Sequence, residues 1–170
     1  FLLAKHYSNT EFASIVDNKA SVDLLNQESA LHARTTDIYI DINNGMDRSG
    51  IRLGKPLEEL IHHIENCKSI NLKGLHIYDG HVRDSDFHSR KEKIQKGFIE
   101  IDLLFDKLKS RHPNIEMIAG GTPSFTTHIS SGNRICSPGT FIFWDWRYNK
   151  ILTEQKFDYA ALVICRVISK

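Results

Sequence analysis

The sequence predicts an α/β fold with a parallel sheet, and within that class it favours a (β/α)8 barrel of the TIM type. Short apolar, strand-like segments alternate with amphipathic helical segments, which is typical of parallel strands joined by helical crossovers. In addition, glycine-rich or polar residues directly follow four consecutive expected strands, at residues 43–50, 78–81, 120–124 and 137–141. Barrel enzymes carry their chemistry at this end of the strands, so these four segments indicate one shared site.

The expected strands are short runs rich in isoleucine, leucine, valine or aromatic residues. They cover residues 1–7, 12–18, 37–43, 72–80, 114–120, 134–141 and 158–169. No helix clearly separates the last strand from the segment before it, so this strand departs from the repeated strand–helix pattern.

Three helices are expected between these strands, over residues 19–33, 54–67 and about 86–110. The second has Pro56 in its first turn and acidic residues soon after, as helix starts often do. Each helix is expected to turn one apolar face toward the sheet. These faces comprise Leu24, Leu25 and Leu31 in the first helix, Leu57, Leu60, Ile61 and Ile64 in the second, and Phe87, Ile94, Phe98, Ile101, Phe105 and Leu108 in the third.

Composition excludes several classes of function. The chain has 170 residues, of which 41% are hydrophobic and 25% charged, and its formal net charge is +1. This balance argues against nucleic acid or an anionic membrane as the main partner. No apolar run approaches the roughly 20 residues of a membrane span. The widely spaced Cys67, Cys136 and Cys165 suit reduced thiols in a cytoplasmic protein better than a disulfide framework.

The two ends of the chain resemble the interior of a longer protein. The sequence begins FLLAKHYSNT, without a methionine, and ends ALVICRVISK, so apolar runs stand at both ends. Domains more often place polar, frayed segments at their termini. We therefore expect an internal fragment that is cut within strands at both ends.

Two glycine–threonine pairs favour an anion site, above all for phosphate. Gly120 and Gly121 precede Thr122 in the segment GGTPS, and Gly139 precedes Thr140 in the segment SPGTF. Glycines permit positive φ and close backbone approach, and exposed N–H groups can form a concave anion site. The first segment alone could equally be a tight turn that ends a strand. The second pair favours phosphate, because the loops after the last two strands of such barrels often hold one.

Arg48 is a further candidate, since it lies between Gly45 and Gly50 in the segment NNGMDRSG. An arginine can donate to a cofactor oxygen or ring nitrogen in a fixed orientation. A solvated loop arginine is the alternative, and the spacing alone leaves both open.

The segment HIYDGH combines His76, Tyr78, Asp79 and His81. Strand alternation places His76 and Tyr78 on one face of the sheet and Ile77 on the other. Two histidines and an aspartate can bind a metal ion, which would indicate a metal-dependent barrel hydrolase. The same residues could instead form a polar layer of the barrel and a helix-capping loop.

Five segments resemble a known family: DINNGMDRSGI, GLHIYDGH, GGTPSF, CSPGTFIFWD and AALVICRVISK, in this order. They resemble the alanine-racemase-type, fold-type III barrels that bind pyridoxal phosphate, and more narrowly the branch of D-threonine aldolase and D-serine dehydratase-like enzymes. The resemblance covers nearly the whole chain. It implies that residues 1–150 form about strands 3 to 8 of the barrel and that residues 151–170 begin a C-terminal β domain.

The resemblance also implies which residues bind pyridoxal 5'-phosphate. They are Arg48 and Tyr78 at the ring, and Gly121, Thr122, Gly139 and Thr140 around the phosphate. In the family, the lysine that binds the cofactor lies on the first barrel strand, in a segment that has no counterpart here, and Lys5 is not a substitute. No catalytic residue and no metal ligand is therefore assigned, and the chain alone is expected to have no turnover.

The activity implied by the resemblance is that of a lyase for D-β-hydroxy amino acids, which would cleave D-threonine to glycine and an aldehyde. A divalent metal, manganese or zinc, would be bound beyond Lys170. A D-serine dehydratase and an amino-acid racemase are alternatives within this fold, and a non-catalytic pyridoxal-phosphate carrier is an alternative of another class. The implied partner is a small D-amino acid, and the full-length protein would form a homodimer.

Overall fold

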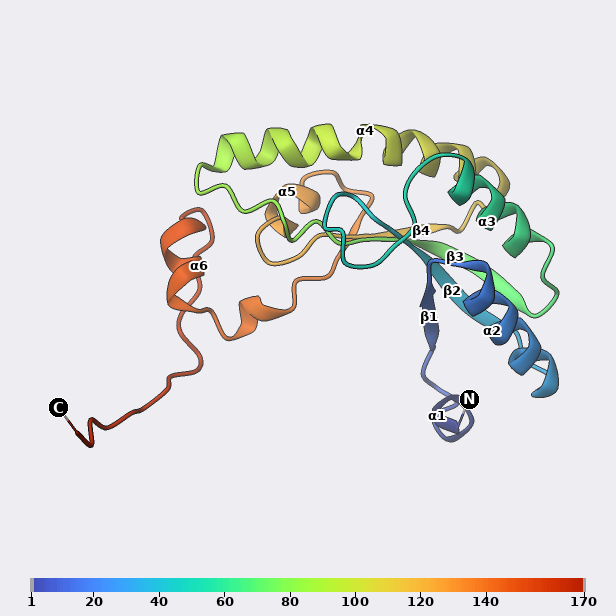
Figure 1. The fold of residues 1–170 in the computed structure, drawn as a ribbon, viewed down its shortest axis with the longest axis horizontal. Helices are drawn as coiled ribbons and strands as arrows, with labels where there is room; N and C mark the ends of the chain where they lie inside the picture. The colour runs from blue at the N-terminus through green and yellow to red at the C-terminus, as the bar shows by residue number, and fades with distance from the viewer. Residues whose placement is uncertain (1, 170) are drawn as a thin grey trace.

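Five parallel strands form one sheet, in the order β1-β2-β3-β4-β5, within residues 2–169, the part of the chain that the computed structural model describes. The strands are β1 (Ala13–Val16), β2 (Thr36–Ile42), β3 (Ile70–Ile77), β4 (Glu116–Ala119) and β5 (Ile135–Cys136). Each strand lies beside the one before it in the sequence, on the same edge of the sheet, whereas the strand order of a doubly wound sheet reverses once. The α/β class and a partial TIM-type barrel are thereby confirmed (Figure 1).

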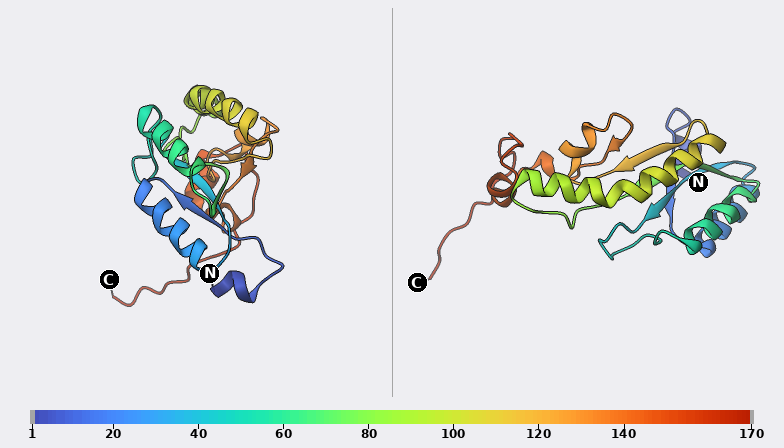
Figure 2. Two further views of the ribbon diagram at one scale, coloured as in Figure 1. Left: turned by 90° about the vertical axis from the view of Figure 1, so that its right-hand side faces the viewer. Right: turned by 90° about the horizontal axis from the view of Figure 1, so that it is seen from above.

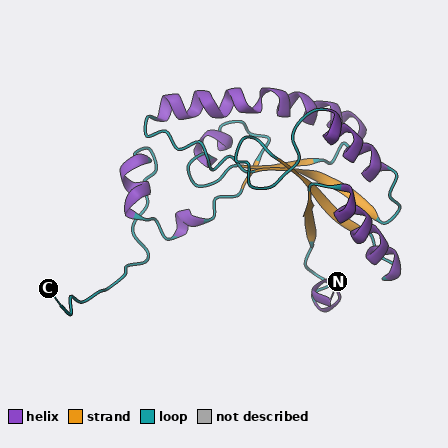
Figure 3. Ribbon diagram, viewed as in Figure 1, coloured by secondary structure: helices purple, strands orange, loops and turns teal. Residues whose placement is uncertain are grey.

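Three helices connect the first four strands and lie along one side of the sheet (Figures 1 and 2). They are α2 (Lys19–Leu31), α3 (Lys55–Glu65) and α4 (Phe87–Arg111). Asn18 and Asp86 cap the starts of α2 and α4, because their side chains accept hydrogen bonds from backbone N–H groups in the first turn. Shorter segments follow β4 and β5, as Figure 3 shows: α5 (Phe125–Ile129), a 3-10 turn (Thr140–Ile142) and α6 (Trp146–Ile151).

The apolar core lies between the sheet and these helices. The predicted apolar face of α3 is buried in full, and so is that of α4 except for Phe87, which is 37% exposed in the first turn. Ile38, Ile40 and Ile42 supply the β2 side of the core. The opposite face of the sheet is more polar: there, the Tyr39 hydroxyl donates to Glu116 at 2.5 Å.

The strand predicted over residues 1–7 is wrong for the described residues, which form helix α1 (Leu2–His6). This stretch contains no β-branched residue, and leucine, alanine and lysine favour helix. No side chain of α1 is buried, so no packing against the sheet imposes an extended conformation.

The predicted apolar face of α2 is confirmed for Leu25, which packs against the core, and is wrong for Leu24 and Leu31. Leu24 and Leu31 are 61% and 71% exposed, whereas Val22 and Ser29 are buried. Apolar residues occur on both sides of this helix, so their spacing alone does not identify the side that meets the sheet. Ser29 can be buried because its hydroxyl forms a 2.7 Å hydrogen bond with that of Thr36 at the start of β2.

The last two predicted strands are shorter or not formed. The strand expected over 134–141 is reduced to β5, and residues 158–169 lie in no strand and extend away from the sheet (Figure 1). An apolar run forms a strand only when a neighbour completes its hydrogen bonds, and the sheet of residues 2–169 offers none at this position. The second domain expected from residue 151 therefore stays a prediction. Within residues 2–169, no helix combines the length and hydropathy that a membrane crossing requires.

Candidate functional site

The candidate site lies at the carboxyl ends of β2 to β5. Because these strands are parallel neighbours, the segments 43–50, 78–81, 120–124 and 137–141 all leave the same edge of the sheet. Side-chain contacts described below join the first segment to the second, the second to the third, and the third to the fourth. The prediction that they meet is thereby confirmed.

Arg48 lies over the ring of Tyr78, with its guanidinium carbon 4.7 Å from the ring centroid. The face of an aromatic ring attracts a cation, so this contact holds the loop after β2 against the end of β3. The cavity beside the pair is lined by Asp41, Met46 and Ser49, among others, and has a volume of only about 10 Å³. Arg48 therefore covers the side of the Tyr78 ring that it faces.

The loop that carries Arg48 folds back on the end of β2. Gly50 has a φ of +94°, and a Cβ added there would stand 2.6 Å from the backbone nitrogen of Asn43. The Gly50 N–H donates to Asp17 at 3.0 Å, and Ile51 then pairs in parallel with Ile42. Gly50 therefore allows the close return that places Arg48 beside β3.

Tyr78 packs against two glycines. A Cβ at Gly80 would stand 2.3 Å from the Tyr78 hydroxyl oxygen, and a Cβ at Gly121 would stand 2.7 Å from Tyr78 Cε2. Gly121 is thus required by close approach, whereas its neighbour Gly120 has the positive φ, +87°. The N–H of Gly121 donates to the hydroxyl of Ser124 at 3.0 Å.

Thr122 and Thr140 meet across the site, with their hydroxyl oxygens 3.1 Å apart. Thr122 is only 3% exposed, and its carbonyl accepts a 2.8 Å hydrogen bond from Gln155. Gly139 has an ordinary φ of −94°, and a Cβ there would meet no atom within 4 Å. Gly139 therefore uses neither a positive φ nor a close backbone approach, and it borders open space.

Asp41 and His76 form a polar pair. His76 is a candidate from the sequence, but its contact with Asp41 was not predicted. His76 Nδ1 donates to Asp41 at 2.7 Å, and the Ser49 hydroxyl donates to the other carboxylate oxygen at 2.9 Å. Burial favours the neutral carboxyl, but these hydrogen bonds and the charge of Arg48 outweigh it, so the pKa of Asp41 lies below its ordinary value. Strand alternation was the available signal, since Asp41 and His76 are partners in the β2–β3 register.

The alternative metal cluster of His76, Asp79 and His81 is not assembled. His76 binds Asp41, Asp79 is buried and binds Ser124 and His128, and His81 is exposed. Residues 2–169 contain no group of three or more histidine, cysteine, aspartate or glutamate side chains placed to hold a metal ion. The contacts of Asp79 with Ser124 and His128 were also missed, because neither partner stands in a motif that predicts them.

The assembled side chains suit a planar ligand that carries an anionic group. Tyr78 offers an aromatic surface, Arg48 a cation, and Thr122 and Thr140 two hydroxyl donors, while Gly139 leaves room beside them. A few convergent polar groups around an aromatic surface are typical of small-molecule sites.

Residues 3–145 match the protein family described as alanine racemase, N-terminal domain. Among solved structures, D-threonine aldolase from Filomicrobium marinum aligns with a TM-score of 0.77 and 26% identity, over 93% of this chain and 44% of that one. Alanine racemase from Clostridium difficile 630 aligns with a TM-score of 0.64 and 14% identity, over 83% of this chain and 38% of that one.

Alanine racemase from Corynebacterium glutamicum aligns with a TM-score of 0.54 and 18% identity, over 76% of this chain and 35% of that one. The two racemases share the fold with this chain, which spans less than half the length of each of these three proteins. No curated protein matches the sequence.

Proposed function

This chain belongs to the family of alanine racemase N-terminal domains, and we propose that it supplies part of a pyridoxal 5'-phosphate site in an enzyme that acts on D-β-hydroxy amino acids. The observation that carries the proposal is the convergence of Arg48, Tyr78, Thr122 and Thr140 at the carboxyl ends of neighbouring strands. Barrel enzymes bind phosphate-bearing ligands at this end of the sheet.

The chemistry of these residues fits the cofactor. Tyr78 presents a ring face against which a pyridine ring can stack. The Thr122 and Thr140 hydroxyls can each donate to a phosphate oxygen, and the open space beside Gly139 lets the phosphate approach the backbone. When bound, pyridoxal phosphate supplies an electron sink that weakens a bond at the α-carbon of an amino acid.

In this proposal, Arg48 lies in one position without the cofactor and in another when the cofactor is bound. It covers Tyr78 as described, so a ring that stacks on that face must displace it. The guanidinium would then donate to the ring edge, where its fixed geometry orients the cofactor. The ionised Asp41 keeps a negative charge near Arg48, which limits how far the arginine moves.

The substrate class rests on the similarity to the solved D-threonine aldolase, at 26% identity over 93% of this chain. D-Threonine would be cleaved to glycine and an aldehyde, and manganese or zinc would be required by the full-length protein. The reaction is tested by offering that protein D-threonine, D-serine and D-alanine with either metal. Glycine from D-threonine supports the proposal. Pyruvate from D-serine would favour a dehydratase, and racemised D-alanine without either product would favour a racemase.

The cofactor site is tested by titrating the chain with pyridoxal phosphate and with pyridoxal, which lacks the phosphate, and following absorbance. We expect tighter binding of the phosphate form, and an affinity about tenfold lower in Arg48→Ala, as for a lost hydrogen bond to a charged group. Arg52→Ala is the matched control, because Arg52 is an exposed arginine of the same loop, paired with Asp47. Equal affinities for both ligands, unchanged in Arg48→Ala, would contradict the site.

A further inference from the structure

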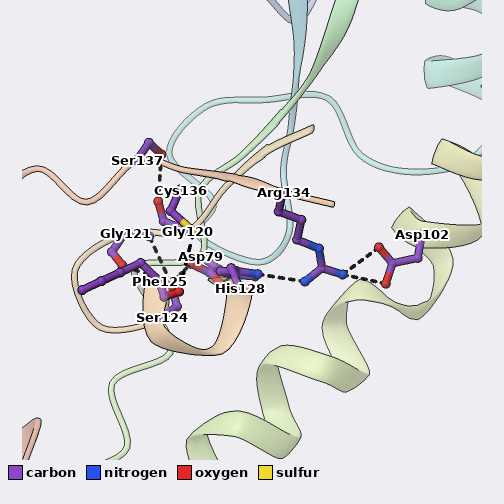
Figure 4. A network of polar contacts seen from close by, with 10 residues as sticks. All are labelled: Asp79, Asp102, Gly120, Gly121, Ser124, Phe125, His128, Arg134, Cys136 and Ser137. Carbon is purple, nitrogen blue, oxygen red and sulfur yellow. Dashed lines mark hydrogen bonds and ion pairs between the residues drawn. The ribbon is translucent and has the colours of Figure 1, made fainter. Parts of the chain in front are cut away.

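A chain of polar contacts, buried at Asp79, Ser124 and His128, joins the glycine turn (residues 120–124) to α4, as Figure 4 shows. Both carboxylate oxygens of Asp102 in α4 accept from Arg134 at 2.7 Å, and Arg134 also lies 2.8 Å from His128 Nδ1. His128 Nε2 lies 2.7 Å from Asp79, whose other carboxylate oxygen accepts from the Ser124 hydroxyl. The chain thus runs from a helix outside the sheet to the turn at the candidate site.

The contacts determine where the protons lie. A guanidinium group has only donors, so His128 Nδ1 must be the acceptor of the contact with Arg134. His128 is therefore neutral and carries its proton on Nε2, from which it donates to Asp79. Ser124 accepts from the Gly121 N–H and donates to Asp79, so the carboxylate of Asp79 accepts at both oxygens.

These contacts hold the glycine turn from two sides. A Cβ at Gly120 would stand 2.5 Å from His128 Cδ2, and a Cβ at Gly121 would stand 2.7 Å from Tyr78 Cε2. The turn is thus enclosed between the His128 ring and the Tyr78 ring. Asp79 directly follows Tyr78, so one short segment supplies both the ring at the site and the carboxylate that binds His128 and Ser124.

We propose that Asp79 and His128 are positioning residues: His128, held as the neutral Nε2–H tautomer, and Asp79 together fix the glycine turn against Tyr78. Their effect on cofactor binding rests on the function proposed above. Their effect on the turn itself does not, because every contact in the argument lies within the chain.

The first test is nuclear magnetic resonance of the chain without cofactor. The nitrogen shifts of His128, assigned from the signal lost in His128→Gln, should indicate a protonated Nε2 and an unprotonated Nδ1. The Gly121 amide should exchange with solvent at least roughly tenfold faster in Asp79→Asn, since asparagine has one acceptor oxygen for two donors. Asp106→Asn, an exposed position on α4, is the control. A proton on Nδ1, or unchanged exchange of Gly121, would overturn the proposal.

The second test is the affinity for pyridoxal phosphate. His128→Gln can keep both contacts, because its amide has an acceptor and a donor, whereas His128→Phe keeps only the ring. We expect about tenfold weaker binding in His128→Phe and in Asp79→Asn. In His128→Gln, the affinity should stay within about threefold of wild type. If only the size of the side chain mattered, His128→Phe would bind better than His128→Gln. Wild-type chain that binds no cofactor, with the resonance results intact, would refute the proposed function but not the positioning. If His128→Phe and Asp79→Asn both bind pyridoxal phosphate as tightly as wild type, the positioning role at the cofactor is refuted.

Discussion

The hydroxyl oxygens of Thr122 and Thr140 lie 3.1 Å apart, although 18 residues separate them along the chain. The contact joins the turn after β4 to the segment after β5, so two glycine–threonine motifs that look alike in sequence also share one place in the fold. In the proposed site, both hydroxyls would turn from each other toward phosphate oxygens.

Replacing either threonine with valine should therefore reduce affinity for the phosphate form of the cofactor. Thr122→Val and Thr140→Val keep the branched shape and remove one donor, and we expect each to weaken pyridoxal phosphate binding about tenfold. Binding of pyridoxal, measured by the same absorbance titration, should change by less than about twofold. An equal loss of affinity for both ligands would indicate that the threonines contact the pyridine ring and not the phosphate.

Gly121 and Gly139 should respond differently to a methyl group. Gly121→Ala forces Cβ within 2.7 Å of the Tyr78 ring, and we expect it to destabilise the fold by about 1–3 kcal/mol. Gly139→Ala meets no neighbour, so its free energy of unfolding should stay within about 0.5 kcal/mol of wild type. Urea denaturation measures both values.

Although Gly139→Ala should leave stability unchanged, its affinity for pyridoxal phosphate should fall, because the methyl group would enter the space proposed for the phosphate. A Gly139→Ala chain that binds pyridoxal phosphate as tightly as wild type would remove Gly139 from the site. Gly132→Ala, where a Cβ likewise meets no atom within 4 Å, controls for the general cost of replacing an exposed loop glycine, although its positive φ adds strain.

The lowered pKa of Asp41 predicts a pH dependence of stability. The ionised carboxylate is favoured in the folded state, so its stabilisation is present above the ordinary aspartate pKa of about 3.9 and is lost as the pH falls through the lower folded-state value. In Asp41→Asn this dependence should disappear. The wild-type advantage in free energy of unfolding should therefore shrink on acidification from roughly pH 5 to pH 2.

Ser49→Ala provides the graded control, since it removes one of the two side-chain hydrogen bonds to Asp41 and leaves His76 in place. It should retain part of the pH dependence. A wild-type advantage that stayed constant over this pH range would show that Asp41 does not titrate as described.

The buried ion pair of Arg90 and Glu154 is expected to contribute strongly to the stability of the fold. Arg90 is fully buried in α4 and donates to Glu154 and to the backbone carbonyl of Asp84. Glu154→Ala leaves a buried guanidinium without its counter-charge, and we expect a loss of about 2–4 kcal/mol in urea denaturation. The double variant Arg90→Met/Glu154→Ala should recover much of it, because the unpaired charge is gone. A double variant no more stable than Glu154→Ala would contradict this account.

Periodicity predicted the helices well where one face is clearly apolar and poorly where it is not. The stripe of α3 and most of that of α4 are buried, whereas α2 turns Val22 and Ser29 to the sheet and leaves Leu24 exposed. A helix with apolar residues on several sides does not specify its buried side; the neighbouring strands select it.

The predicted strands formed where the sheet offers neighbouring strands and did not form where it offers none. β2 and β3 appear close to their predicted positions, because each has a neighbour on both sides. The apolar runs at the two ends of the chain have no such neighbours within residues 2–169: one forms α1 and the other lies in no helix or strand. Apolar composition makes a strand possible, and hydrogen-bond partners make it form.

Local pattern was enough to predict the parallel α/β architecture and the shared edge of segments 43–50, 78–81, 120–124 and 137–141, because parallel strands bring their carboxyl ends to one edge. It could not predict the contact of Asp79 with His128, 49 residues away, or that of Arg134 with Asp102. Those pairs depend on how α4, α5 and the glycine turn pack together. Only the folded chain brings such distant polar groups close enough to satisfy one another.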